Sequence, residues 1–442
     1  MNDKITMQQI LNIRYIAMFL RNGVVKIVSN VKIAICAAIA VLICGYFVFA
    51  NIPHVDGAIG KMCSDLYTFA ALVLGTMLLL CAIWFVGAPK GYLTIMQHMY
   101  RVGMLNAAGE APVLVQRQKS LDKPRVELWT YETFGVPFSS WLDYAERLES
   151  ALDIAVLSAE PGRNGRTVLL RVIPHPGPWP KMLLWDNSLI SPKESVLILG
   201  ENRSEQVTLD LAVIPHLLIA GRTGSGKSVL QKSIMLQALL KHMDVILVDY
   251  KSGVDYSREW HEHCQFIMDD DNFLAALTAT MKEMQRRQVI LRESGYPNID
   301  KYNHAHAGPM LHRICLVVDE IAECMDRNSS NRETKLIVAA ISDSIATLCR
   351  LGRATGIHVI LATQRGSADV LSGQIRSNVF KMLGSADENL SILTLGNADA
   401  AKKIPADAQG RFIDERGNMF QAYYSDYEHD VFAPLEHMEV DQ

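Results

Sequence analysis

The chain has 442 residues, of which 49% are apolar and 20% are charged. This composition excludes an intrinsically disordered protein, because disordered chains are poor in apolar residues and rich in charged ones. The 43 basic and 47 acidic residues give a net charge of −4, so any contact with nucleic acid must be local or built from several subunits. None of the eight cysteines forms a C-x-x-C pair. They are therefore expected to be reduced thiols in packed interiors rather than a disulfide framework or a zinc ribbon.

Two uncharged apolar segments near the N-terminus, residues 33–52 and 66–88, are each long enough to cross a hydrocarbon core of about 30 Å. The connection between them is too short for a domain, so residues 1–104 are predicted to contain a transmembrane hairpin. Basic residues gather before the first segment and after the second, which places both termini in the cytoplasm by the positive-inside rule. A cleaved signal peptide ending near Ala50 is the alternative, but a long apolar core and a second span speak against it. Residues 89–104 are expected to extend the second helix into the cytoplasm.

Residues 105–200 have a different pattern, with short β-rich runs at 112–116, 167–172 and 195–199 and one helical stretch at 139–151. Proline and glycine interrupt these runs. The pattern predicts a small α+β domain. It carries no chemical motif, so its expected role is that of a spacer or of a platform for packing subunits.

From residue 201 to 442 apolar strands alternate with helices. The expected strands are 217–220, 245–248, 314–318 and 357–363, and the expected helices are 228–242 and 272–292, the latter behind the N-cap candidate Asp271. Strands that are almost entirely apolar are buried on both faces, as in a parallel sheet covered by helices. The fold class predicted for this region is therefore α/β.

A phosphate-binding motif follows the first of these strands. The residues Gly221-Arg222-Thr223-Gly224-Ser225-Gly226-Lys227-Ser228 match G-x-x-x-x-G-K-[ST]. Glycines allow backbone N–H groups to close around phosphate oxygens, and the N-terminus of the following helix attracts the same anion. Lys227 is expected to reach the β- and γ-phosphates of ATP and Ser228 to ligate Mg²⁺.

A pair of carboxylates, Asp319 and Glu320, ends the strand 314–318. Behind a phosphate-binding loop such a pair suits ATP hydrolysis, with Asp319 holding Mg²⁺ through water and Glu320 activating the attacking water. The glutamate favours an ATP hydrolase over a GTP switch, and no N-K-x-D motif follows. Asp249, at the end of another strand, is a second carboxylate in this region. It is interpreted either as a helper beside the loop or as a turn residue.

Two further residues complete the predicted catalytic set. Gln364 follows the strand 357–363 and could sense the γ-phosphate. Arg353 precedes the same strand, on the opposite edge of the sheet, from which it could reach a neighbouring subunit's nucleotide. Arg350 and Arg376 are alternatives for this role, and a surface arginine is the simpler interpretation.

Two other polar clusters are given no function. The His261–Cys264 and His304–His306 runs contain metal-type ligands without a recognised spacing and are interpreted as polar loops. Arg286, Arg287 and Arg292 are interpreted as a solvated helix face or a subunit contact.

The order of these motifs resembles the FtsK/SpoIIIE family of DNA-pumping ATPases over residues 195–425. The stretches that carry the resemblance are 215–228, 283–287, 302–303, 317–323 and 353–365. The resemblance implies a RecA-like motor, a hexameric ring that hydrolyses ATP at subunit boundaries, double-stranded DNA in the pore, and a lead-in domain before the motor. It favours Arg353 as the residue acting in trans. Because 369–378 resembles the family's DNA-facing stretch, Arg376 and Lys381 are the pore candidates.

The departures from the family narrow the hypothesis. The family's chromosome translocases have more membrane spans, a long linker and a winged-helix domain that reads orientation sequences, and Tyr250 stands where the family usually has proline. Two spans, a compact lead-in and a bare motor are more similar to TcpA-type coupling proteins of conjugative elements. The predicted function is a DNA translocase of the bacterial plasma membrane that meets a relaxase or transfer-channel proteins. A chromosome-segregation pump, a protein-secretion ATPase and a nucleotide-gated assembly factor are the rivals.

Overall fold

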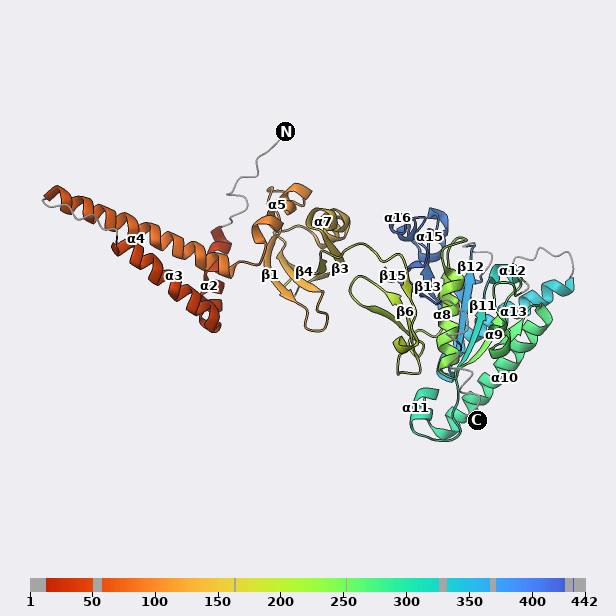
Figure 1. Cartoon of the computed structure of the whole chain (residues 1–442). Helices are drawn as coiled ribbons and strands as arrows, with labels where there is room; N and C mark the ends of the chain where they lie inside the picture. The colour runs from red at the N-terminus through yellow and green to blue at the C-terminus, as the bar shows by residue number, and fades with distance from the viewer. Residues whose placement is uncertain are drawn as a thin grey trace. The chain divides into compact units, whose positions relative to one another are not determined.

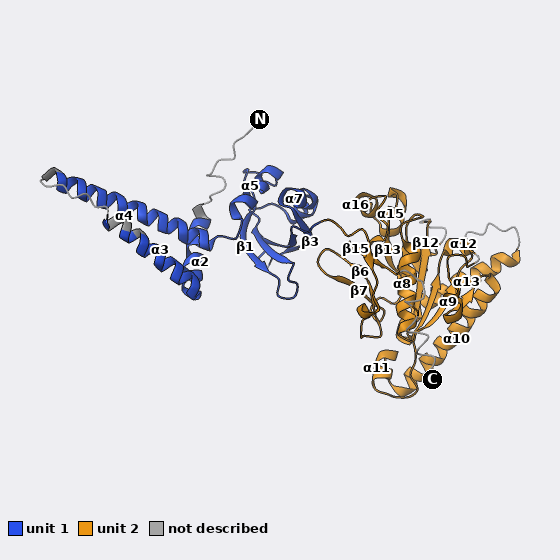
Figure 2. Ribbon diagram, in the orientation of Figure 1, with its two compact units in different colours: residues 1–177 blue, residues 178–442 orange. Residues whose placement is uncertain are grey.

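The computed structural model describes residues 13–50, 58–162, 164–251, 253–325, 332–365, 371–425 and 432. The chain divides into two compact units, Met1–Gly177 and Pro178–Gln442 (Figure 2). The expected boundaries at 104 and 200 were drawn on sequence pattern alone and stay a prediction.

The described part of unit 1 starts with the amphipathic helix α2 (Ile13–Ser29) and the apolar helices α3 (Val31–Ala50) and α4 (Ala58–Gly87) (Figure 1). Within the described residues, the stretch Gly60–Gly87 is long and apolar enough to cross a membrane, whereas α2 and α3 qualify only as a pair bent by 107°. The apolar helices are therefore present, and the two-span hairpin remains a prediction. Residues 51 and 52 of the first expected span lie outside the described residues.

The second apolar helix does not continue to residue 104 as expected. It ends at Gly87, and a separate helix α5 (Tyr92–Val102) follows a turn in which Gly91 has φ +77°. The reason is local: Pro89 lacks an N–H group for a continuous helix, and Gly91 supplies the left-handed conformation that the turn needs.

The remainder of unit 1 is a four-stranded antiparallel sheet in the order β1-β2-β4-β3, accompanied by two short helices. Aromatic side chains such as Trp129, Tyr131 and Trp141 are buried in its core. This arrangement agrees with the expected α+β pattern, except that the helical stretch divides at Tyr144. The elements are β1 (Val113–Lys119), β2 (Glu127–Glu132), α6 (Phe138–Asp143), α7 (Ala145–Leu152), β3 (Ile154–Pro161) and β4 (Thr167–Pro174).

Unit 2 is built on one large sheet in the order β10-β9-β11-β12-β8-β13-β14-β15-β6-β7, with β5 beside β15. The neighbours along β10, β9, β11, β12, β8 and β13 pair in parallel. The neighbours along β13, β14, β15, β6 and β7 pair antiparallel. The predicted α/β fold with a largely parallel sheet is thus confirmed. The strands are β5 (Leu183–Leu184), β6 (Val196–Glu201), β7 (Gln206–Asp210), β8 (Leu217–Ala220), β9 (Asp244–Val248), β10 (Gln265–Ile267), β11 (Ile314–Val318), β12 (Ile357–Thr363), β13 (Phe380–Leu383), β14 (Arg411–Asp414) and β15 (Met419–Tyr424).

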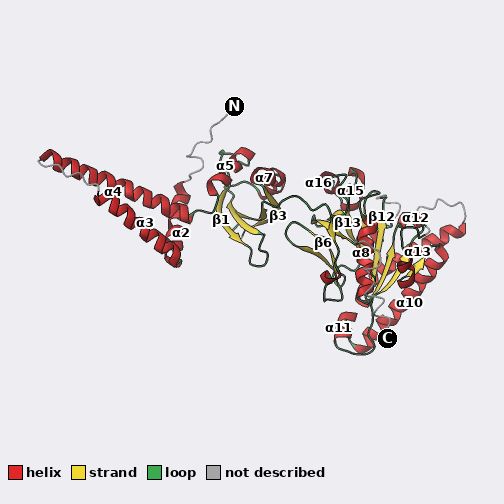
Figure 3. Ribbon diagram, viewed as in Figure 1, coloured by secondary structure: helices red, strands yellow, loops and turns green. Residues whose placement is uncertain are grey.

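Helices cover both faces of the large sheet, with α8 in one apolar core and α10 with α13 in the other (Figure 3). The first turn of α10 differs from the prediction, because Asp269 and not Asp271 caps it, accepting from the Asn272 N–H at 2.9 Å. The helical elements are η1 (Asn187–Leu189), α8 (Lys227–Leu240), α9 (Arg258–His263), α10 (Asp270–Ser294), α11 (Ile299–His304), α12 (Ile321–Met325), α13 (Arg332–Leu351), η2 (Arg353–Thr355), α14 (Gly373–Asn378), α15 (Glu388–Leu395) and α16 (Asp399–Lys403).

Strand β6 lies in the large sheet of unit 2, although its residues were expected in the preceding α+β domain. The buried side chain of Gln237 on α8 explains this position. Its amide accepts from the Ile198 N–H and donates to the Ile198 carbonyl, both at 2.8 Å. This pairing across 39 residues satisfies a buried backbone group that would otherwise be costly to leave without a partner.

Candidate functional site

The phosphate-binding motif forms a tight loop between β8 and α8. Gly221, Gly224 and Gly226 have φ of +151°, +78° and +96°, conformations that favour glycine. At Gly226 a Cβ would come within 2.8 Å of the Gly410 nitrogen. Gly410 in turn donates its N–H to the Ser225 carbonyl at 2.9 Å. Residues before β14 therefore support the loop directly.

The side chains of this loop fit a bound triphosphate. Lys227 is the first residue of α8 and is buried, and burial lowers the pKa of its ammonium group while Glu320 and Asp319 oppose that shift. The Ser225 hydroxyl is also buried and has no hydrogen-bond partner among the described residues. A buried cation and an unsatisfied hydroxyl beside a helix N-terminus are suited to phosphate oxygens.

The predicted carboxylates lie at the end of β11, and both are buried. Asp319 pairs with the Lys251 ammonium, with 3.1 Å between Oδ2 and Nζ. Glu320 accepts from the Thr363 hydroxyl at 3.0 Å and from the Gln364 N–H at 3.1 and 3.0 Å. The end of β12 therefore orients Glu320. Neither Thr363 nor Lys251 was predicted to belong to the site; the signals in the sequence were their positions at or just after a strand end.

Gln364 links these carboxylates to the phosphate-binding loop. Its side-chain oxygen accepts from the Thr223 hydroxyl at 2.6 Å, while its backbone N–H contacts Glu320. A movement of Thr223 in the loop can therefore be transmitted to Glu320 through Gln364 alone.

Asp249 is a turn residue in this structure. Its buried carboxylate accepts the N–H groups of Lys251 and Gly253 at 2.9 and 2.8 Å. It thereby positions Lys251 beside Asp319, which is an indirect contribution to the site.

The residues proposed to hold Mg²⁺ supply a hydroxyl from Ser228 and a carboxylate from Asp319. Oxygen donors of this kind suit Mg²⁺, which keeps several waters and takes further ligands from substrate phosphates. The described residues contain no group of three or more His, Cys, Asp or Glu side chains that could hold a metal ion. His261 and His263 lie on helix α9 and not in the expected polar loop, and their rings stack on Phe266 and Phe432.

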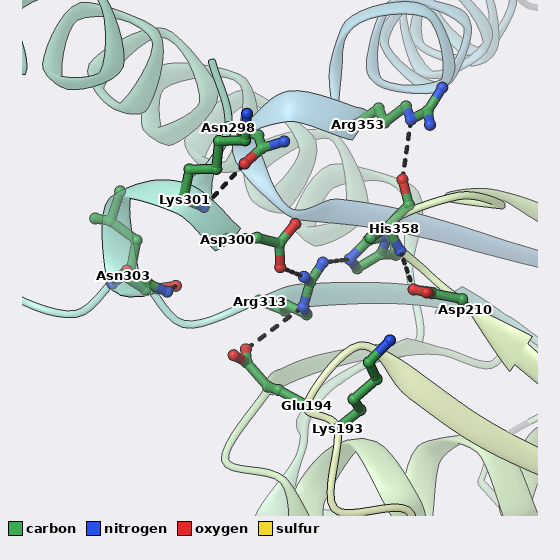
Figure 4. A network of polar contacts seen from close by, with 12 residues as sticks. Lys193, Glu194, Asp210, Asn298, Asp300, Lys301, Asn303, Arg313, Arg353 and His358 are labelled. Atoms are coloured by element: carbon green, nitrogen blue, oxygen red, sulfur yellow. Dashed lines mark hydrogen bonds and ion pairs between the residues drawn. The ribbon is translucent and has the colours of Figure 1, made fainter. Parts of the chain in front are cut away.

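Arg353 lies at the opposite edge of the sheet from the loop. Thr363, at the far end of β12, pairs with Ala220 just before the loop, whereas Arg353 precedes the first residue of β12. Seven residues of strand separate the two places by roughly 20 Å. The exposed Arg353 donates from Nε to the Ala212 carbonyl at 3.0 Å (Figure 4). One chain alone therefore does not bring Arg353 to its own phosphate-binding loop.

A buried polar network underlies that edge (Figure 4). Arg313 contacts Nε2 of His358 at 3.0 Å and pairs with Asp300 and Glu194. Arg287 belongs to the same region, because its guanidinium donates to the carbonyls of His312 and Thr355 at 2.6 and 3.0 Å. The expected solvated arginine face is thus wrong for Arg287, which is buried and holds η2 in place.

The pore candidates occupy different surroundings. Arg376 lies on α14, just before β13, and its half-buried side chain has an Nε without a hydrogen-bond partner among the described residues. Lys381 lies within β13 and pairs with Glu415, with 3.1 Å between Nζ and Oε2. Residues 369 and 370 of the stretch 369–378, which is expected to face DNA, lie outside the described residues.

The buried His216, which directly precedes β8, predicts how the stability of the fold changes in acid. Burial lowers the pKa of His216 to about 4, and its Nδ1 accepts from the Val359 N–H at 3.1 Å. The unfolded chain binds a proton near pH 6.5 and the folded chain does not, so stability falls as the pH drops from 6.5 toward 4, by about 3 kcal/mol. In His216→Gln, which keeps an acceptor, denaturant unfolding should show a smaller loss over this range. The exposed His261→Gln should behave like the wild type; an unchanged slope in His216→Gln would contradict the assignment.

The parallel sheet, the loop after β8 and the paired carboxylates define a P-loop NTPase with a RecA-like motor domain. The FtsK/SpoIIIE family profile matches residues 191–311. The chain is 32% identical to the pCW3 conjugation coupling protein TcpA, solved as a monomer with ATPgS, over 80% of this chain and all of that one, with a TM-score of 0.59. The chain belongs to the FtsK/SpoIIIE family.

Two curated relatives extend the comparison. The chain is 34% identical over 230 residues to the DNA translocase SpoIIIE of Bacillus subtilis, covering 47% of this chain and 28% of that protein. It is 33% identical over 251 residues to the DNA translocase FtsK of Treponema pallidum, covering 50% and 30%. The match thus spans less than a third of the length of these relatives.

Proposed function

We propose that this chain is a membrane-anchored, ATP-driven DNA translocase that acts as a coupling protein and delivers DNA to a conjugative transfer channel. The observation that carries the proposal is the similarity to TcpA, because it extends over the whole of that chain and not over the motor alone. The apolar helix α4 supports the anchor. The TcpA comparison favours conjugation over a chromosome-segregation pump or a protein-secretion ATPase.

The proposed chemistry uses residues that the fold brings together. Ser228 and Asp319 would hold Mg²⁺, which would neutralise charge on the phosphates, and Lys227 would contact the β- and γ-phosphates. Glu320, oriented by Thr363 and Gln364, positions and deprotonates the attacking water. Gln364 reports the state of the γ-phosphate to Thr223 and Glu320.

DNA as cargo is tested by ATP turnover. Linear double-stranded DNA should raise the rate of ATP hydrolysis by the purified full chain. Arg376→Ala should weaken this stimulation. It should also reduce, by about one, the slope of the logarithm of the DNA-binding constant against the logarithm of the salt concentration, as expected for the loss of one phosphate contact. The basal rate should not change. Arg258→Ala, which removes an exposed arginine on α9, is the control. An ATP hydrolysis rate that DNA does not change would favour a protein cargo.

The place of this motor in conjugation is tested in donor cells. Transfer of the mobile element should collapse when the gene carries Glu320→Gln, while division and chromosome segregation stay normal. Transfer that survives the loss of hydrolysis would favour a nucleotide-gated assembly factor.

The position of Arg353 predicts an active site shared between subunits of a ring, for which we propose a hexamer. Arg353→Ala and Lys227→Ala should each lose most turnover, by about 10³-fold if the arginine stabilises transition-state charge. Mixing the two should restore part of it, because an Arg353→Ala subunit keeps its loop and a Lys227→Ala subunit keeps its arginine. Lys227→Ala mixed with Glu320→Gln should show no recovery, since both residues serve one subunit's own site. Absence of recovery in the first mixture would leave Arg353 a structural residue.

A further inference from the structure

Helix α2 is apolar on two opposite sides. Tyr15, Phe19 and Gly23 lie on its inner side and are buried. On its outer side Val24, Val25 and Val28 are 49%, 59% and 79% exposed. Arg21 is exposed on the same side, so this side combines valines with a basic residue. Exposed valines opposite a side that is already buried indicate a covering partner or a membrane surface, where a basic side chain among apolar ones is typical.

The inner side is fixed against the end of α4 by very close packing. A Cβ on Gly23 would come within 2.0 Å of the Ile83 carbonyl oxygen, and one on Gly87 within 1.7 Å of the Phe19 carbonyl oxygen. The Lys26 ammonium donates to the Val86 carbonyl at 3.0 Å, which caps the C-terminus of α4. Helix α2 is therefore held across α4 at the point where the apolar helix ends.

Contacts with the sheet of unit 1 place this point at the boundary between apolar and polar structure. The Tyr15 hydroxyl donates to Glu132 on β2 at 2.8 Å. The Phe19 ring lies edge-on to Trp84 at the end of α4 and to Tyr92 at the start of α5. Aromatic residues with a polar atom are typical of the interface between a membrane and water.

The bend between α2 and α3 sets the direction of α2. The Asn30 side chain accepts from the N–H groups of Lys32 and Ile33 at 3.1 and 3.4 Å, so it caps α3 and separates the two helices. The axes meet at 107°. If α3 runs along the membrane normal, α2 lies nearly in the membrane plane.

We propose that α2 lies in the cytoplasmic head-group layer of a phospholipid bilayer, with Val24, Val25 and Val28 against the acyl chains. Arg21, exposed on the same helix, contacts lipid phosphates. The exposed apolar surface continues from Val28 to Val31 and Ile35 on α3, so one lipid environment covers both helices. This inference rests on the membrane anchoring proposed above. It assigns α2 a role as an interfacial brace between the anchor and the sheet of unit 1.

Site-specific photo-crosslinking tests the placement. Benzoylphenylalanine replaces Val24 or Val28 in the full chain, reconstituted into vesicles of phosphatidylcholine and phosphatidylglycerol, and mass spectrometry measures the lipid adducts. Leu78, exposed in the middle of α4, is the reference for the span, and the fully exposed Leu121 is the control outside the membrane. We expect several-fold more lipid adduct at positions 24, 28 and 78 than at 121. Arg21→Glu should lower the yield at position 28.

The outcomes separate the two proposals. Lipid adducts at 78 but not at 24 or 28 would overturn the placement of α2 and leave the anchor intact. Crosslinks from 24 and 28 to a second copy of the chain would show that the valines form a subunit interface and would also overturn it. Adducts at none of the three positions would overturn both the placement and the anchoring.

Discussion

Glu320→Gln should abolish ATP turnover while leaving ATP binding intact. The amide cannot accept the proton of the attacking water, and loss of a general base typically lowers the rate by about 10²–10⁴-fold. The fold should tolerate the change, because the remaining side-chain oxygen can still accept from the Gln364 N–H and the Thr363 hydroxyl. Phosphate release and the binding of a non-hydrolysable analogue measure the two effects separately.

The control for this substitution is Glu323→Gln. Glu323 lies one turn away on α12 and is exposed, so its substitution should leave the rate unchanged. A Glu320→Gln chain that turns over ATP at the wild-type rate would show that another group activates the water.

Lys227→Met should remove ATP binding without unfolding the motor. A ligand present at 100 times its Kd stabilises the folded state by about 2.7 kcal/mol, and this gain should vanish in the variant. Methionine has a similar length and carries no charge. Because burial already disfavours the Lys227 ammonium, the ligand-free protein should be at least as stable as the wild type. Thermal unfolding with and without ATP and Mg²⁺ measures both values.

Lys241→Met, at the C-cap of the same helix, is the matched control. The Lys241 ammonium donates to the carbonyls of Ser191 and Lys193 at 2.6 Å, far along α8 from the loop. Its loss should lower the stability of the ligand-free protein and keep the stabilisation by ATP. The assignment of Lys227 would be wrong if Lys227→Met kept that stabilisation.

The elements that pattern predicted best are those with a strong local signal. The bounds of β8, β11 and β12 agree with the expected strands, because these mainly apolar runs are followed by glycine, by an acidic residue or by glutamine. The phosphate-binding motif was readable for a similar reason, since its chemistry depends on residue types at fixed spacing. Helix ends were less well predicted. Neighbouring aspartates at 269, 270 and 271 are equivalent as caps in sequence, and only the backbone geometry selects Asp269.

The amino-acid pattern was sufficient to predict the phosphate-binding loop, the alternation of strands and helices, and the apolar N-terminal helices. Each of these features depends on residues that are close together in the chain. The folded chain alone decided which groups meet across long separations. Thr363 orients Glu320, Lys251 pairs with Asp319, Gly410 supports Gly226, and Gln237 holds β6 in the motor sheet. Such contacts depend on packing between segments that are distant in the chain, and the local periodicity of apolar residues does not predict them.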